Sequence, residues 1–188
     1  MSTVTLNLNP IIKLTDEQFY QLCRANPDVP LERNAQGELI IVSPVGGEGG
    51  IQEADYIADL VLWNRQARSG KVFSSSTAFK LPKGGERAPD AAWIGLDRWN
   101  ALTPEQQEKF PPICPDFVIE LRSRTDRLSV LQAKMQEYLD SGLRLGWLID
   151  PQNQQVEIYR IGRSMEVVKL PAQLSGEDVL PGFVLELP

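Results

Sequence analysis

Two carboxylates beside apolar runs are the side chains best suited to catalysis in this chain of 188 residues. Glu120 interrupts the apolar run 117–121, which we expect to form a buried strand. Burying an unpaired carboxylate costs several kcal/mol, so Glu120 needs either a partner or a chemical task. Asp90 follows Pro89 in a second expected strand, 88–94, although a solvated turn aspartate is a common alternative.

A divalent cation is the simplest counter-charge for these two carboxylates, provided that their strands are neighbours. Converging carboxylates repel each other and cannot easily both stay ionised without a cation. Oxygen ligands and retained water suit Mg²⁺ or Mn²⁺, and the backbone carbonyl of Leu121 can add a ligand. Such a metal lowers the pKa of bound water and offsets charge during phosphoester hydrolysis. The residues alone do not single out DNA among phosphoesters.

Three charged side chains are further candidates for this site. Arg122 shares strand parity with Glu120, so we expect both to point to one face. Lys134 lies on an amphipathic helix after this strand, where it is either a site cation or an ordinary solvated lysine. Glu53 stands one helical turn before Ile57, so it either shares an inward face or stabilises the helix N-terminus through the dipole.

The order of expected elements indicates a mixed α/β fold, with a central sheet flanked by helices and an N-terminal helix and hairpin. The elements are a helix opened by Thr15, a hairpin over 31–42, a loop over 43–50, a helix over 51–68, an extended segment over 71–81, a strand over 88–94, a helix start at Thr103, a strand over 117–121, the amphipathic helix, and strands over 145–149, 155–161, 166–170 and 183–187. The helix over 51–68 is expected to bury a stripe of Ile57, Leu60, Val61 and Asn64, widened by Ala54, Ala58 and Leu62. The length favours one domain over residues 1–188.

The composition excludes several kinds of chemistry. The chain has no histidine, so Ser-His-Asp, Cys-His and His-metal sites are absent. A net charge of −6 gives no overall attraction to nucleic acid or to an anionic membrane. Cys23 and Cys114 lack metal-ligand spacing and are expected to be free thiols. We expect a cytoplasmic protein, because the sequence shows neither a signal peptide nor an apolar run long enough to span a membrane.

An ordered set of motifs resembles the Uma-type restriction endonucleases, a family abundant in cyanobacteria and formerly classed as a domain of unknown function. The motifs are SPVGGEGG, APDAAW, PDFVIELRS, LQAKMQEY and LGWLIDP, and the resemblance is clearest over residues 40–151. The family belongs to the PD-(D/E)XK nuclease superfamily. The resemblance therefore implies a restriction-endonuclease-like domain over 1–188, with a nuclease core over about 40–161.

The resemblance assigns roles to individual residues. Asp90 matches the aspartate of the superfamily motif, and Glu120 matches the acidic residue that follows it, both as ligands of Mg²⁺ or Mn²⁺. Glu53 matches a first-helix glutamate that some branches add to the metal site. The implied activity is endonucleolytic hydrolysis of DNA, and homodimers are expected because related restriction enzymes are often dimeric.

The chain departs from the superfamily motif at its lysine. Arg122 stands at that position, and an arginine does not readily lose a proton to act as a general base. Lys134 in LQAKMQEY fits a lysine that has moved to the helix, with Gln132 beside it as a supporting residue.

Two other functions remain open on the sequence. A catalytically degenerate module that keeps the nuclease fold for binding or assembly would explain the acidic charge and Arg122. A structural dimer could instead be held together by exposed Trp93, Trp99 and Trp147, although tryptophans more often lie in a core.

Overall fold

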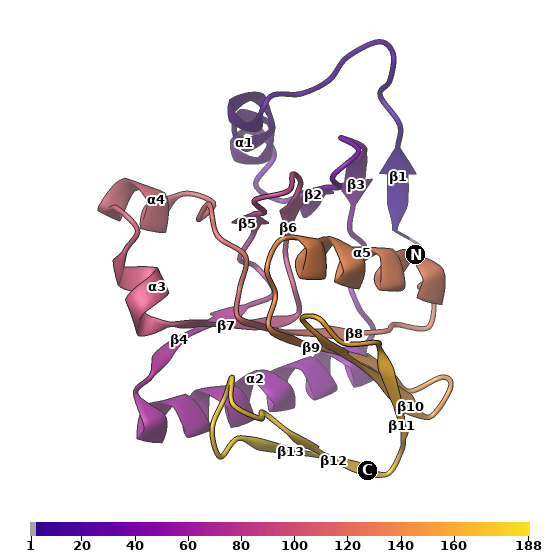
Figure 1. Ribbon diagram of the computed structural model, residues 1–188. Helices are drawn as coiled ribbons and strands as arrows, with labels where there is room; N and C mark the ends of the chain where they lie inside the picture. The colour runs from indigo at the N-terminus through magenta and orange to yellow at the C-terminus, as the bar shows by residue number, and fades with distance from the viewer. Residues whose placement is uncertain (1–2) are drawn as a thin grey trace.

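A six-stranded sheet in the order β11-β10-β9-β8-β7-β4 forms the centre of the computed structural model, which describes residues 3–188 (Figure 1). Its strands are β4 (Gly70–Ser74), β7 (Ala91–Gly95), β8 (Phe117–Leu121), β9 (Leu145–Asp150), β10 (Gln155–Arg160) and β11 (Glu166–Lys169). The pair β8 and β9 is parallel, and the other neighbouring pairs are antiparallel. The crossover from β8 to β9 is made by helix α5 (Leu128–Asp140), as a parallel pair requires.

Helices cover both faces of this sheet, which confirms the expected layering. Figure 1 shows α2 (Gly47–Ala67) along one face and α5 along the other. Side chains alternate along β8, so Phe117 and Ile119 pack in the cluster that contains Leu60 of α2. Val118 packs instead with Met135 of α5. Glu120 has the same parity as Val118 and therefore lies on the α5 face.

A second sheet lies on the same side of the central sheet as α5 (Figure 1). Its order is β1-β3-β2-β6-β5, with β1 (Val4–Leu6), β2 (Leu31–Arg33), β3 (Leu39–Ile41), β5 (Phe79–Lys80) and β6 (Glu86–Arg87). The expected hairpin is present as the antiparallel pair β2 and β3. The sequence did not predict that β6 joins β2, a pairing between segments 53 residues apart. This sheet, called the small sheet below, forms one wall of the candidate site.

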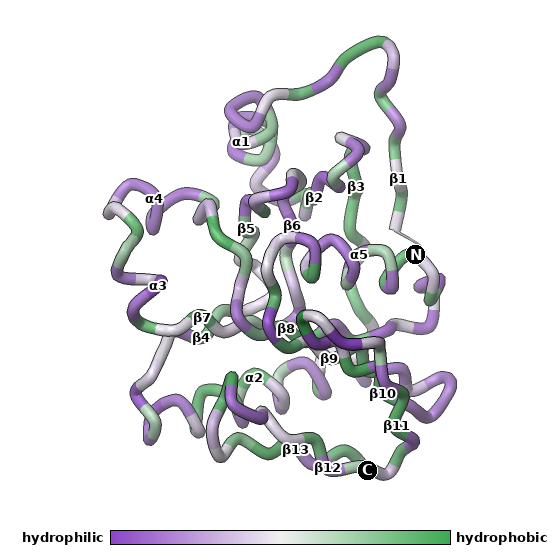
Figure 2. The backbone as a smooth tube through the Cα atoms, in the orientation of Figure 1, coloured by the Kyte–Doolittle hydropathy of each residue, from purple (hydrophilic) through white to green (hydrophobic). Residues whose placement is uncertain are grey.

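The remaining elements flank the two sheets, and the last two strands contribute Leu174, Leu185 and Leu187 to the core. These elements are α1 (Asp16–Ala25), α3 (Leu96–Asn100), α4 (Pro104–Glu108) and the antiparallel pair of β12 (Ala172–Ser175) with β13 (Val184–Leu187). The predicted helix starts are confirmed, because Thr15 and Thr103 each close a capping box. Figure 2 shows α3 and α4 as mostly hydrophilic, which agrees with their position outside the core.

Two predictions about the segment around α2 were wrong. The helix begins at Gly47 within the predicted loop, and the N–H of Gly50 already donates to the Gly46 carbonyl at 2.9 Å. Ala54, Ala58 and Leu62, expected to widen the buried stripe, are exposed. The residues buried on this helix are Tyr56 and Leu60. A helix on a flat sheet contacts it over a narrow stripe, so the wider stripe was an overestimate.

The extended segment expected over 71–81 is broken by a turn. The N–H of Thr77 donates to the Ser74 carbonyl at 3.0 Å, and the chain passes there from β4 in the central sheet to β5 in the small sheet. The run Ser74–Thr77 favours a turn because short polar side chains compete with strand hydrogen bonds. The turn places Ser75 and Ser76 at the candidate site.

The proposed role of exposed tryptophans in a dimer was wrong for two of the three residues. Trp93 is 4% exposed and Trp147 is fully buried. Trp93 donates from Nε1 to Asn64 Oδ1 at 2.9 Å, and Trp147 stacks on Phe183. These rings build the core next to α2, so they cannot form a contact between protomers.

Two further sequence expectations concern thiols and membranes. Cys23 and Cys114 are free, as expected. Over residues 3–188, no helix has both the length and the hydrophobicity needed to cross a bilayer.

Candidate active site

Asp90 and Glu120 lie opposite each other, because their two strands are neighbours, which is the condition that the sequence expectation required. Strands β7 and β8 pair antiparallel with Ala91 opposite Ile119, so the next position places Asp90 opposite Glu120. Asp90 accepts a hydrogen bond at Oδ2 from the N–H of Leu121 at 2.6 Å. Glu120 is 2% exposed, whereas Asp90 is partly exposed. The two carboxylates thus meet where the strands of the central sheet open toward a pocket.

Lys134 reaches this pair from α5. Its Nζ lies 2.8 Å from Oε1 of Glu120 and donates to Oε2 at 3.0 Å. The same Nζ donates to Oε1 of Glu32 at 3.0 Å and to the carbonyl of Ala88 at 2.9 Å. Lys134 is 8% exposed, so the alternative of an ordinary solvated lysine was wrong.

Glu32 on β2 is a member of the site that sequence reasoning missed. Its carboxylate accepts from Lys134, from the N–H of Ala88 at 3.2 Å and from Nη1 of Arg87 at 2.9 Å. A charged residue in a three-residue strand resembles an exposed one, yet Glu32 is 4% exposed, because Arg87 of β6, Lys134 of α5 and the backbone of Ala88 contact its carboxylate. The available signal was the repeated Glu-Arg dipeptide at 32–33 and 86–87, which can form reciprocal ion pairs across two strands.

Tyr138 is a second member whose role the sequence did not reveal. We expected it only as part of the packing stripe of the helix, four residues after Lys134. Its hydroxyl donates to Oε1 of Glu120 at 3.0 Å. Burial, followed by the Glu120 carboxylate, raises the pKa of Tyr138 well above its ordinary value, so the hydroxyl keeps its proton. Glu120 is therefore held from α5 by both an ammonium and a phenol.

The electrostatics separate the roles of Asp90 and Lys134. Burial, and then the nearby Glu120 carboxylate, raise the pKa of Asp90 well above its ordinary value of 3.8. Burial alone would lower the pKa of Lys134, but Glu120 and Glu32 together raise it above its ordinary value. Lys134 is therefore held as an ammonium by the two carboxylates that it contacts. Because the pKa of Asp90 is raised, Asp90 is the carboxyl group whose ionised form an added cation would stabilise most.

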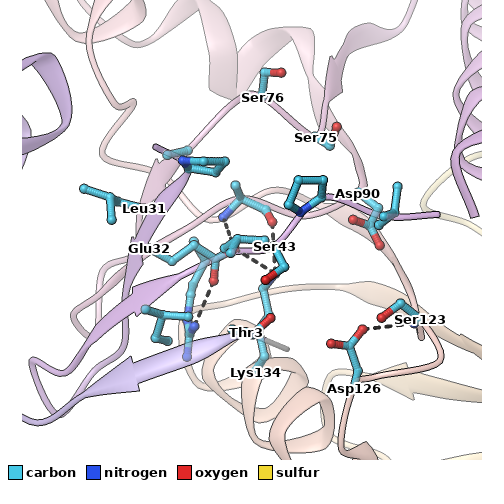
Figure 3. A pocket seen from close by; sticks show the side chains of 18 of the residues that line it. Thr3, Leu31, Glu32, Ser43, Ser75, Ser76, Asp90, Ser123, Asp126 and Lys134 are labelled. Carbon is cyan, nitrogen blue, oxygen red and sulfur yellow. Dashed lines mark hydrogen bonds and ion pairs between the residues drawn. The ribbon is translucent and has the colours of Figure 1, made fainter. Parts of the chain in front are cut away.

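These residues line a cavity of about 930 Å³, called the site pocket below. It is bounded by the small sheet, the turn at Ser75 and Ser76, the segment 123–127 and the start of α5. Figure 3 shows Glu32 at one side of the pocket and Asp90 with Ser123 at the other. The lining therefore combines carboxylates with the hydroxyl groups of several serines.

Glu53 lines the site pocket from α2, on the side of Asp90. Its charge adds to the effects that raise the pKa of Asp90. Glu53 is partly exposed, and the structure gives it no position inside the hydrogen-bond network of Lys134 among residues 3–188. It is thus an electrostatic neighbour of the two opposed carboxylates.

Arg122 and Gln132 are directed away from the two opposed carboxylates. Arg122 donates from Nη1 to Oδ2 of Asp150 at 2.9 Å and from Nε to the carbonyl of Asp126 at 3.2 Å. Gln132 donates from Nε2 to Oε1 of Glu157 at 2.8 Å. Neither is among the described residues that line the site pocket. Strand parity predicted that Arg122 and Glu120 share a face of the sheet. The guanidinium of Arg122 nevertheless binds Asp150 at the end of β9 and does not enter the pocket.

Arg122→Ala is expected to lower the free energy of unfolding by about 1–3 kcal/mol, because it removes the cation from a buried carboxylate. Asp150 is fully buried and would keep only neutral donors, such as Nδ2 of Asn153 at 2.7 Å. Urea denaturation measures this loss, and a manganese titration of the folded variant should match that of the wild type. A variant of wild-type stability would contradict the bracing role of this ion pair.

The donor set at Asp90 and Glu120 suits a divalent cation. No three carboxylate or thiol groups among residues 3–188 already converge as a metal-binding cluster. Mg²⁺, however, usually keeps several waters and needs only one or two protein carboxylates. Carboxylates outnumber the cations Lys134 and Arg87 around the site; they are Glu32, Glu53, Asp90, Glu120 and Glu137. A divalent ion at Asp90 and Glu120, with the Leu121 carbonyl nearby, would offset part of this negative charge.

Fold and site together define a protein of the nuclease-fold class. Residues 16–188 match the Uma2 family, whose description is "Putative restriction endonuclease", and the chain belongs to this family. A crystal structure from Anabaena variabilis, described as "a putative nuclease belonging to DUF820", has a TM-score of 0.73 at 20% sequence identity. The superposition covers 92% of this chain and 94% of that one, which shows a shared fold. No curated protein matches the sequence significantly.

Proposed function

We propose that the chain is a metal-dependent endonuclease that hydrolyses phosphodiester bonds in DNA. Asp90 and Glu120 would hold Mg²⁺ or Mn²⁺, with the backbone carbonyl of Leu121 as a further ligand. The observation that carries this proposal is the opposition of these carboxylates on β7 and β8, with the buried ammonium of Lys134 on Glu120. The family description supports nucleic acid as the substrate.

Each side chain of the site has a distinct task under this proposal. A bound divalent cation would supply a water of lowered pKa and offset charge on the phosphate. Lys134 opposes the rise in the pKa of Glu120 that burial causes, and it provides a fixed positive charge close to the reacting phosphate. The hydroxyl groups of Ser75 and Ser76 line the pocket and can donate hydrogen bonds to phosphate oxygens.

The other predicted residues act at a greater distance. Glu53 assists by adding negative charge beside Asp90, which increases the affinity of the pair for a cation. Gln132 fixes α5 against β10 through Glu157, and Arg122 fixes the end of β8 against β9 through Asp150. These contacts support the site without touching the substrate.

Supercoiled plasmid provides the direct test. Wild-type protein should nick it with Mg²⁺ or Mn²⁺, and Asp90→Asn and Glu120→Gln should each abolish nicking while the folded state persists. Asp59→Asn serves as the matched control, because Asp59 is an exposed carboxylate on α2 outside the pocket. Identical plasmid patterns for wild type, both site variants and buffer, with either metal, would contradict the proposal.

One observation favours a second candidate, a nuclease-fold module that binds without cleaving. Lys134 and Tyr138 already engage Glu120, so both of its carboxylate oxygens have donors within the chain. Calorimetric titration with Mn²⁺ separates the two functions. A catalytic site should bind the ion and lose that binding in Glu120→Gln, whereas a degenerate site should give the same titration for both proteins.

A further inference from the structure

Glu32 connects the cation of the candidate site to a second buried cation. Oε1 of Glu32 accepts from Lys134 at 3.0 Å, and Oε2 accepts from Arg87 at 2.9 Å. Arg87 in turn donates twice to Glu137 of α5, at 2.7 and 2.9 Å. Glu137 follows Lys134 by three residues, so it lies on the same face of the helix. The small sheet thus contacts α5 at two neighbouring points, Glu32 with Lys134 and Arg87 with Glu137, and Glu32 joins the two contacts.

The contacts of Lys134 account for its hydrogen-bonding capacity. An ammonium has three N–H donors, and Nζ contacts three separate segments: Glu120 on β8, Glu32 on β2 and the Ala88 carbonyl before β7. A lysine has a flexible stem of four methylene groups, so one acceptor cannot fix the position of its charge. Of these three acceptors, Glu32 is the side chain that the small sheet provides.

We infer that Glu32 is a positioning residue, which holds the ammonium of Lys134 at Glu120. This inference rests on the proposed nuclease function, because the value of a fixed cation lies in the reaction. Glu32 acts through Lys134 and touches no reacting atom. Its carboxylate belongs to the small sheet, whereas Asp90 and Glu120 belong to the central sheet. The N-terminal hairpin therefore completes a site whose metal-binding carboxylates come from elsewhere in the chain.

Glu86 provides a matched control within the same sheet. It is 2% exposed on β6 and accepts from Arg33 at 2.7 and 2.8 Å, so it is as buried and as well paired as Glu32. Among the described residues it has no hydrogen bond or ion pair with Lys134. A loss caused by general disruption of the small sheet should appear in Glu86→Gln, and a loss caused by displacement of Lys134 should not.

The experiment compares Glu32→Ala, Glu32→Gln and Glu86→Gln in single-turnover DNA cleavage. Glu32→Ala is expected to reduce the cleavage rate by on the order of 100-fold, with DNA affinity and Mn²⁺ affinity unchanged, because it misplaces a catalytic charge. Glu32→Gln keeps an oxygen for Nζ and should recover part of this rate. Glu86→Gln should melt at a lower temperature and cleave at the wild-type rate. A wild-type rate in either folded Glu32 variant overturns the inference.

A spectroscopic measurement separates failure of this inference from failure of the proposed function. The ammonium of Lys134 should give a ¹⁵Nζ resonance protected from exchange with water, assigned by its loss in Lys134→Arg. The resonance should broaden or disappear in Glu32→Ala and remain in Glu86→Gln. If the wild type cleaves no DNA with either metal, the proposed function fails, and the resonance still decides whether Glu32 holds Lys134. Its persistence in Glu32→Ala overturns the inference, and Glu32→Leu, which also removes the acceptor but keeps the bulk of the side chain, replaces that variant if it does not fold.

Discussion

Lys134→Met is expected to lower the free energy of unfolding by about 3–5 kcal/mol at neutral pH and to abolish metal-dependent cleavage. Methionine nearly preserves the volume of the side chain but removes its charge. Glu120 at 2% exposure and Glu32 at 4% exposure would then stay buried without their shared cation. Removing one partner of a buried ion pair costs more stability than the intact pair contributes, because the remaining charge stays buried and cannot be hydrated.

Urea denaturation at two pH values measures this effect. Burial raises the pKa of Glu120 even in the wild type, and the loss of Lys134 removes the main opposing influence. The destabilisation should therefore shrink under acidic conditions, where a neutral carboxyl group needs no cation. Lys109→Met is the control, because Lys109 forms an exposed helical pair with Glu105 and its loss should have no measurable effect. Equal stability of Lys134→Met and wild type at neutral pH would contradict the buried network.

Asp90→Asn is expected to remove cleavage and yet to stabilise the protein in metal-free buffer. The pKa of Asp90 is raised in the folded state from 3.8, so the folded protein holds this proton more tightly than the unfolded chain. The resulting stability is present in full below pH 3.8 and is lost as the pH rises through the folded-state pKa. Asparagine carries no charge, and its oxygen can still accept from the N–H of Leu121. The Asp90→Asn variant therefore does not lose this stability as the pH rises.

Melting curves across pH, with and without Mn²⁺, test this prediction. In metal-free buffer at pH well above the raised pKa, Asp90→Asn should melt roughly 2–4 °C above the wild type, as about 1 kcal/mol produces in a chain of this size. The advantage should vanish in acid. Added Mn²⁺ should stabilise only the wild type, because a ligand stabilises the state that binds it. A variant that melts at or below the wild-type temperature throughout would contradict the electrostatic assignment of Asp90.

The sequence predicted the two opposed carboxylates because each interrupts or begins an apolar run. An acidic residue such as Glu120 inside a continuous apolar strand is a strong local anomaly. Lys134 could be placed only through the family resemblance, since its helix alone allowed an exposed lysine. The central sheet, its two covering helices and the hairpin were also predictable, because hydrophobic periodicity depends on neighbouring residues.

The missed features depend on contacts between distant segments. Glu32 is buried by contacts with β6 and α5, and the direction of Arg122 depends on Asp150, 28 residues later. The early start of α2 at Gly47 runs against local propensity, because glycine disfavours helices. The run Ser74–Thr77 favours a turn locally, but the passage of the chain from β4 into the small sheet depends on the pairing of β5 with β6. The pairings between distant segments are not contained in any local pattern.

The parallel pair of β8 and β9 limits how the chain can change around the site. Lys134 lies on the crossover helix of this β-α-β unit, 14 residues after Glu120. Such crossovers have one hand and pack back onto the two strands that they join. The helix that carries Lys134 is joined to β8 at one end and to β9 at the other, so this lysine stays beside Glu120 although it is not on the strand. Topology thereby allows a motif to be rearranged in sequence while its charges stay together in space.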